Sequence, residues 1–207
     1  MKLTAQIKLL PTKEQYNALK QTLATANAAC NHISECAWNS NVFGQFRLHK
    51  LVYADVRERY GIGAQMVVRC IAKVADSYKL DKRTKRTFKE FGAVAYDSRN
   101  LRWYTEKSNV TIWTINGRER ISYACGKQQK HLLQFQQGES DLVYHDGAFY
   151  LFTTCNIDDP EPEIVDSFIG VDLGIKNIAT DSDGEVFSGA QVNGLRHRHR
   201  RLRAKLR

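Results

Sequence analysis

The sequence predicts an α+β fold: a small β-barrel domain with an inserted helical bundle, followed by a shorter unit of one β-hairpin and a helix. Three observations predict it. The chain begins with one alternating, strand-like segment, apolar stripes with helical spacing follow, and from residue 91 short strands alternate with hairpin turns. The first strand needs partners, and the later strands are the nearest candidates. The helical region is therefore predicted to be an insertion into the β domain.

The first strand is predicted over residues 2–9, where every second side chain is apolar. Its apolar positions are Leu3, Ala5, Ile7 and Leu9. This period of two is typical of a strand with one buried face. Pro11 ends the strand, and Thr12 followed three residues later by Gln15 has the pattern of a capping box. A helix is therefore expected to begin here.

Three helices are predicted within residues 11–89. The first carries apolar residues spaced by three and four: Tyr16, Leu19, Leu23, Ala26, Cys30, Ile33 and Ala37. A second helix is predicted over residues 48–60 and is stopped by Gly61 and Gly63. The third carries one apolar face: Met66, Val67, Cys70, Ile71, Val74 and Tyr78. These stripes are typical of helices packed in a small bundle.

Two hairpins follow the helices. The predicted strands are residues 110–115, 120–124, 141–144 and 148–155. Asn116-Gly117 lies between the first two strands, and Asp146-Gly147 lies between the last two; both dipeptides favour tight hairpin turns. Several short strands joined by such turns predict a small barrel or an open sheet.

An acidic, proline-containing segment at residues 158–166 is the clearest domain boundary. It holds two of the three prolines in the chain. The predicted divisions are a β-barrel domain at residues 1–10 and 90–157, a helical domain at 11–89, this linker, and a C-terminal unit at 167–207.

After the linker, the apolar residues 168–171 predict a buried strand that delivers one carboxylate, Asp172. A turn signal at residues 182–184 and a return strand at 185–188 complete a hairpin. A carboxylate at the end of a buried strand is how several nuclease and phosphotransfer folds position a metal-binding acid. Three more acidic residues sit in or beside the turn and are expected to face solvent: Asp181, Asp183 and Glu185.

A basic helix is predicted from about Asn193. Four residues share one stripe and predict a packing face: Leu195, His199, Leu202 and Leu206. His197 lies off the stripe and is expected to be solvated. Residues 193–207 carry seven of the chain's lysines and arginines and no acid, so the other residues carry little of the net charge of +9. The seven are Arg196, Arg198, Arg200, Arg201, Arg203, Lys205 and Arg207.

A second basic cluster is interrupted only by Asp81 and comprises Lys79, Lys82, Arg83, Lys85, Arg86 and Lys89. Two concentrated patches on a nearly neutral body predict a polyanion partner, and nucleic acid is the expected one. A solvated helix face is the alternative for either patch alone. The predicted nucleic-acid-binding residues are this cluster together with Arg196, Arg198, Arg200, Arg201 and Arg203.

The composition favours a soluble protein of the cytoplasm. Five cysteines, an odd number without a C-x-x-C pair, indicate thiols in a reducing compartment, and no zinc is expected in this chain. The start of the chain lacks the apolar core of a signal peptide. No run approaches the roughly 18 apolar residues of a membrane span. Neither a membrane nor a small-molecule substrate is expected as a partner.

Two families contain a segment that resembles residues 170–174, Gly-Val-Asp-Leu-Gly. In the fold shared by sugar kinases, actin and heat-shock ATPases, a similar Asp-x-Gly turn approaches nucleotide phosphates. That turn uses small or hydroxyl residues beside the glycine, whereas Ile175 and Lys176 follow here. An actin-like ATPase fragment is therefore the lesser alternative.

The chain more closely resembles the TnpB (OrfB) family of insertion-sequence proteins, which are transposon-encoded, RNA-guided nucleases. Residues 2–15 are similar to that family's first strand and helix entry. Residues 170–184 resemble its first RuvC motif, and residues 194–203 resemble the basic helix that follows. The resemblance implies a wedge-like β-barrel domain with an inserted helical recognition domain, then the first hairpin and helix of an incomplete RNase H-like (RuvC) domain.

The resemblance also implies that Asp172 is the first RuvC carboxylate, a ligand of Mg²⁺ for DNA cleavage, with guide RNA and DNA as partners. Two metal ions about 3.5–4 Å apart require several carboxylates. The family takes a further Glu and Asp, and a zinc ribbon, from later segments, so this chain alone is expected to be inactive. Two alternatives stay open: half of a split or interrupted nuclease completed by a C-terminal fragment in trans, or a decayed product with exposed apolar surface.

Three aromatic residues of the strand region have two interpretations: Trp103, Tyr104 and Trp113. In one they stack on RNA bases. In the other, which is the favoured interpretation, they are packed in the core.

Overall fold

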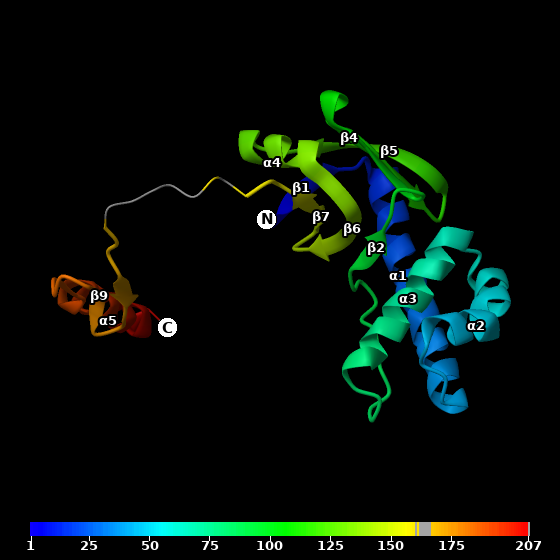
Figure 1. Cartoon of the computed structure of the whole chain (residues 1–207), viewed down its shortest axis with the longest axis horizontal. Coiled ribbons are helices and arrows are strands. Elements are labelled where there is room, and N and C mark those ends of the chain that lie inside the picture. Colours follow the sequence, from blue (N-terminus) through cyan, green and yellow to red (C-terminus); the bar gives the residue numbers. More distant parts are fainter. Residues whose placement is uncertain (160, 162–166, 207) are drawn as a thin grey trace. The chain divides into compact units, whose positions relative to one another are not determined.

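The computed structural model describes residues 1–159, 161 and 167–206. Contacts divide the chain into two compact units, Met1–Asp159 and Pro160–Arg207. Most of the predicted acidic linker, residues 160 and 162–166, lies outside the described residues. The first unit contains a β-sheet and three long helices, and the second contains short strands and a helix (Figure 1).

The sheet of the first unit is antiparallel, with the strand order β2-β6-β7-β1-β5-β4-β3. Its strands are β1 (Lys2–Leu10), β2 (Val94–Tyr96), β3 (Leu101–Tyr104), β4 (Asn109–Thr114), β5 (Gly117–Ala124), β6 (Gln136–His145) and β7 (Ala148–Asn156). The edge strands β2 and β3 are joined by only the short turn 97–100, so the two edges are drawn together. The Tyr96 hydroxyl of β2 donates to the carbonyl of Trp113 in β4, the strand next to β3, at 3.1 Å. The sheet is a nearly closed barrel, which confirms the predicted fold class.

β1 lies in the middle of the sheet, although it comes first in the chain. Residues 2–8 pair with β7, and residues 8–10 pair with β5. Ala5, Ile7 and Leu9 are buried, while the polar residues between them are exposed. The alternating pattern therefore predicted both the strand and its buried face, and the later strands are its partners, as expected.

The two predicted hairpins are present. Asp146 and Gly147 both have positive φ (47° and 75°), as a type I′ turn requires. The other turn differs by one residue, because β4 and β5 are separated by Ile115 and Asn116, and Gly117 begins the return strand with a φ of 103°. Glycine suits that position because side chains disfavour such a φ.

Three helices separate β1 from β2: α1 (Lys13–Ser40), α2 (Gln45–Tyr60) and α3 (Ala64–Leu80). The predicted capping box at Thr12 and Gln15 is formed, and α2 begins three residues earlier than predicted. α1 leaves the sheet and runs beside α3 (Figure 1). The buried faces of the helices and of the sheet form one hydrophobic core, which includes Leu19, Ile71 and Phe149. A short helix, α4 (Lys127–Leu132), precedes β6.

The second unit contains β8 (Val171–Leu173), β9 (Asn177–Asp181), β10 (Val186–Ser188) and α5 (Ala190–Lys205). The strands form an antiparallel sheet in the order β10-β9-β8. The prediction of a buried strand at 168–171 was wrong. The strand begins at Val171, so Asp172 lies in its middle, and Phe168 is 87% exposed. The physical reason is that three short strands and one helix, the described elements of this unit, supply no second layer to cover the sheet.

Two predictions for α5, its first residue and its packing face, differ from the structure. The helix begins at Ala190, three residues before the predicted start. The apolar stripe predicted as a packing face is exposed along its length, with Leu195 at 53% and Leu202 at 57%. Across the described part of the chain, no helix is both long enough and apolar enough to cross a membrane.

Candidate nucleic-acid interface

The predicted cluster from Lys79 to Lys89 is not a helix face. Lys79 lies in the last turn of α3, and the other five basic residues lie on the irregular segment that leads to β2. We call residues 81–92 the basic loop. Its conformation is held by side chains rather than by a strand partner.

A polar stripe on α1 holds the backbone of the basic loop. The stripe consists of Asn27, Asn31 and Ser34, whose spacing of four and three residues places them on one helix face. The Asn31 amide donates to the Phe88 carbonyl at 2.9 Å and accepts from the Phe88 N–H at 2.7 Å. Ser34 Oγ donates to the Arg86 carbonyl at 2.7 Å. These bonds satisfy backbone groups that the loop would otherwise leave to water.

The buried Asn27 extends this clamp to the end of the loop. Its Nδ2 donates to the carbonyls of Glu90 and Gly92, at 3.2 and 2.8 Å. Its Oδ1 accepts from the Lys73 ammonium at 2.7 Å. The loop therefore projects its basic side chains from a backbone fixed at several points.

Half of the basic cluster is already paired with acids. Lys79 pairs with Asp76 (2.5 Å), Lys85 with Glu35 (3.1 Å) and Arg86 with Asp81 (3.3 Å). Within the described residues, the other three cations of the cluster make no ion pair: Lys82, Arg83 and Lys89. Exposed ion pairs contribute about 0–1 kcal/mol, so a phosphate can replace a carboxylate at little cost.

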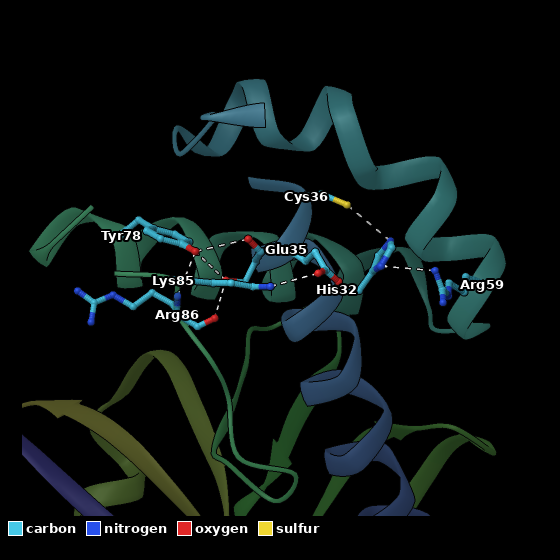
Figure 2. A network of polar contacts seen from close by, with 8 residues as sticks. His32, Glu35, Cys36, Arg59, Tyr78, Lys85 and Arg86 are labelled. Carbon is cyan, nitrogen blue, oxygen red and sulfur yellow. Dashed lines mark hydrogen bonds and ion pairs between the residues drawn. The ribbon is translucent and has the colours of Figure 1, made fainter. Parts of the chain in front are cut away.

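A recess of about 490 Å³ lies between the basic loop, α1 and the end of α2 (Figure 2). His32, Arg59, Lys85 and Arg86 line it, with Glu35 as the acidic residue. Its surface is basic and polar, which suits an anion better than an apolar ligand.

The Cys36–His32–Asp55 group beside this recess is not a nucleophile with its base. Cys36 Sγ and Asp55 Oδ2 both approach the same ring nitrogen, Nε2, of His32, at 3.8 and 2.7 Å. Arg59 Nη1 lies 3.5 Å from the other ring nitrogen. Burial raises the pKa of the Cys36 thiol, and the carboxylates of Asp55 and Glu35 raise it further. The thiol therefore stays protonated and unreactive.

Asp172 stands apart from other acids. It pairs with Thr180 across β8 and β9 and is exposed. Nowhere in the described residues do three His, Cys, Asp or Glu side chains gather closely enough to hold a metal ion. The described sheet contains two carboxylates, Asp172 and Asp181, and they lie on opposite faces because Asp181 follows Thr180, the partner of Asp172. One face therefore does not supply the several carboxylates that two-metal chemistry needs.

Asp181 has a structural role in the hairpin. Its Oδ1 accepts from the N–H of Asp183 at 3.1 Å and of Glu185 at 2.7 Å, and so it shapes the turn. Asp183 and Glu185 are exposed, as expected, whereas Asp181 is half-buried.

α5 carries its cations in two rows on either side of its leucine stripe. One row is Arg196, Arg200 and Arg203, and the other is Arg198, Arg201 and Lys205. The spacings of three and four residues place each row on one face. All six side chains are exposed, and the helix contains no acid. His197 and His199 are exposed as well.

The aromatic residues divide between the two interpretations. Trp103 makes an edge-to-face contact with Tyr123, with ring centroids 5.5 Å apart. Trp113 packs on Gly63, where a Cβ would lie 3.0 Å from the indole. Both are packing residues. Tyr104 differs, because the guanidinium groups of Arg102 and Arg120 lie beside its ring.

Sequence reasoning missed Arg102, Arg118 and Arg120. They do not form a run along the chain, and the strand register brings them together. The only signal in the sequence is the i, i+2 spacing of Arg118 and Arg120 in a predicted strand region, which puts both on one face.

No family model matches the chain, and no curated protein matches it. A solved structure described as a cryo-EM structure of a CRISPR-Cas12f ternary complex is similar, at 12% identity and a TM-score of 0.46. The match covers 93% of this chain and 50% of the other, so this chain spans half the length of the protein it matches.

Proposed function

We propose that this chain corresponds to the N-terminal portion of a TnpB-like, transposon-encoded, RNA-guided DNA endonuclease, and that it binds guide RNA and DNA. The support is the resemblance of residues 2–15, 170–184 and 194–203 to that family, together with the two basic surfaces. Binding, rather than cleavage, is the role proposed for this chain by itself.

The observation that carries the proposal is the uncompensated charge of α5. Six exposed cations stand in two rows on sixteen residues without an acid. Exposed like charges repel one another, so such a helix is stabilised when a polyanion lies along it and releases its own counterions. The clamped basic loop adds a second set of cations on the first unit.

Asp172 is proposed as a ligand of Mg²⁺, which would neutralise phosphate charge at this strand. One exposed carboxylate supplies one of the six oxygen ligands that Mg²⁺ requires, and it does not by itself form a two-metal site. No cleavage step is therefore assigned to the described residues.

Binding is tested with the full chain by fluorescence anisotropy on an RNA hairpin and a DNA duplex over a series of salt concentrations. Replacing one row of α5 (Arg196→Gln, Arg200→Gln, Arg203→Gln) is expected to reduce the slope of log K against log salt by about 2 to 3. The charge-matched control replaces Lys2, Lys127 and Lys130 by Gln. Binding that does not depend on salt would contradict the proposal.

The absence of autonomous cleavage is tested separately. The purified chain with Mg²⁺ is expected to leave both substrates intact. Mg²⁺-dependent cleavage that is abolished by Asp172→Ala would show that the binding-only role is wrong.

A second candidate is one half of a split nuclease, completed in trans by a C-terminal fragment. The exposed apolar residues of the second unit favour it: Phe168, Ile169, Val171, Leu173, Ile175, Ile178, Val186, Phe187, Leu195 and Leu202. A co-expressed fragment with a Glu-bearing strand, paired C-x-x-C motifs and a late Asp is expected to co-purify and to restore cleavage. If the fragment neither co-purifies with this chain nor restores cleavage, this candidate is excluded.

A further inference from the structure

The outer face of β3, β4 and β5 gathers arginines from separate parts of the chain. Across the three strands, Arg102 pairs with Thr111, and Thr111 pairs with Arg120. Arg118 lies two residues before Arg120 and therefore on the same face. We call Arg102, Tyr104, Arg118 and Arg120 the arginine face.

The guanidinium groups of this face are held in place. Arg102 and Arg120 lie 5.4 and 5.1 Å from the centroid of the Tyr104 ring, within cation–π range. Arg118 donates to the Arg99 carbonyl at 2.6 Å and to Thr111 Oγ1 at 3.4 Å. Because they are already ordered, they lose less side-chain entropy when they bind a ligand.

The charge of the arginine face is uncompensated. In the part of the chain that the structure describes, none of the ion pairs involves Arg102, Arg118 or Arg120. The nearby acid Glu119 pairs with Ile112, not with Thr111, and so points to the opposite face, where it accepts from Gln15. The basic loop differs, since two of its cations, Lys85 and Arg86, have carboxylate partners. The arginine face is therefore expected to bind an anion more strongly than the basic loop does.

The polar groups beside the arginines favour RNA. Tyr104, Asn109 and Ser122 form the next row across the same three strands. Hydroxyl and amide groups suit the 2′-hydroxyl of RNA, and aromatic rings or guanidinium planes suit an unpaired base. Duplex DNA is usually read by a helix or a two-stranded ribbon in its groove, which a broad sheet face does not offer.

We propose that the arginine face binds single-stranded RNA, with phosphates at Arg102, Arg118 and Arg120 and a base stacked at Tyr104. This inference rests on the proposed nucleic-acid-binding function and adds a third surface to α5 and the basic loop. It assigns RNA to the barrel of the first unit, independently of the second unit.

The test uses the full chain and a fluorescein-labelled oligouridine of about 16 nucleotides, the upper end of the usual site size for a single-strand-binding barrel. The double variant Arg102→Gln/Arg120→Gln is expected to bind at least tenfold more weakly. Its slope of log K against log salt should fall by about 1.4, since each phosphate on a single strand contributes about 0.7. Tyr104→Leu, which keeps the charge, is expected to weaken binding about fivefold or more with an unchanged slope.

The control is Lys127→Gln/Lys130→Gln, which removes the same charge from the exposed α4. Circular dichroism and thermal unfolding establish that each variant is folded.

Equal affinities and slopes for the arginine-face and control variants would overturn the inference. So would a loss of duplex DNA binding with oligouridine binding intact, because the occupant would then be a duplex. If the unaltered chain binds an RNA hairpin while the arginine face has no role, the inference fails and the proposed function stands. If the unaltered chain binds no nucleic acid, both fail.

Discussion

The two units of this chain contain similar apolar strands with opposite fates. In the first unit, Ile7, Ile112 and Leu151 are fully buried, because helices and a closing barrel cover one face of each strand. In the second unit, the strand residues Val171 and Leu173 are 54% and 74% exposed. The difference shows that an apolar sequence pattern predicts that a segment forms a strand, but it does not predict that the strand is buried. Burial requires a second layer, and among the described residues only the first unit has one.

The largest expected effect tests this comparison directly with the same substitution in both units. Leu151→Ala should destabilise the first unit by about 2–5 kcal/mol, because a buried methyl cluster is lost and a cavity remains. Leu173→Ala should change the stability of the second unit by less than about 0.5 kcal/mol. Urea unfolding of the full chain measures both, with near-UV circular dichroism reporting on the first unit and hydrogen exchange of the β8 and β9 amides reporting on the second, which contains no Trp or Tyr. Equal effects would show that the second unit buries its strand.

The clamp on the basic loop gives the next largest effect. Asn31→Leu leaves the N–H and the carbonyl of Phe88 without partners, at an expected cost of about 2–3 kcal/mol. Asn17→Leu, at an exposed position of the same helix, is the matched control and should cost little. Hydrogen exchange at the Phe88 amide should accelerate only in the first variant. Unchanged exchange would mean that the loop is held by other contacts.

A pH titration tests the burial of the first unit at one residue, Tyr123, which is only 5% exposed. Burial, helped by the nearby Cys125, raises the pKa of Tyr123 to about 12 from an ordinary value of 10.0. The folded pKa lies above the unfolded one, so this contribution to stability is complete below pH 10 and is lost as the pH rises towards 12. The expected loss is on the order of 2 kcal/mol.

Urea unfolding between pH 9 and pH 12 measures the total alkaline loss, to which the buried Tyr96 also contributes because burial raises its pKa, and Tyr123→Phe should reduce that loss by the share of Tyr123. A variant that keeps the full alkaline loss would assign that loss to other groups.

Much of the fold was predictable because it depends on local patterns. The capping box at Thr12, the alternation of β1 and the turn at Asp146-Gly147 are each specified by residues a few positions apart. The candidate site was predictable only as charge. A solvated helix face was one of the two interpretations of the basic loop. No pattern near the loop in the sequence predicts that Asn27, Asn31 and Ser34 hydrogen-bond to its backbone.

The sequence by itself determined most of the secondary structure and the two basic clusters, since periodicity, turn chemistry and charge act over short distances along the chain. The tertiary structure decided which surfaces carry that charge and which strands are buried. Strand register unites Arg102 with Arg120, helix packing fixes the loop backbone, and the layers present in each unit decide burial. These outcomes depend on contacts between residues far apart in the sequence, which no local pattern contains.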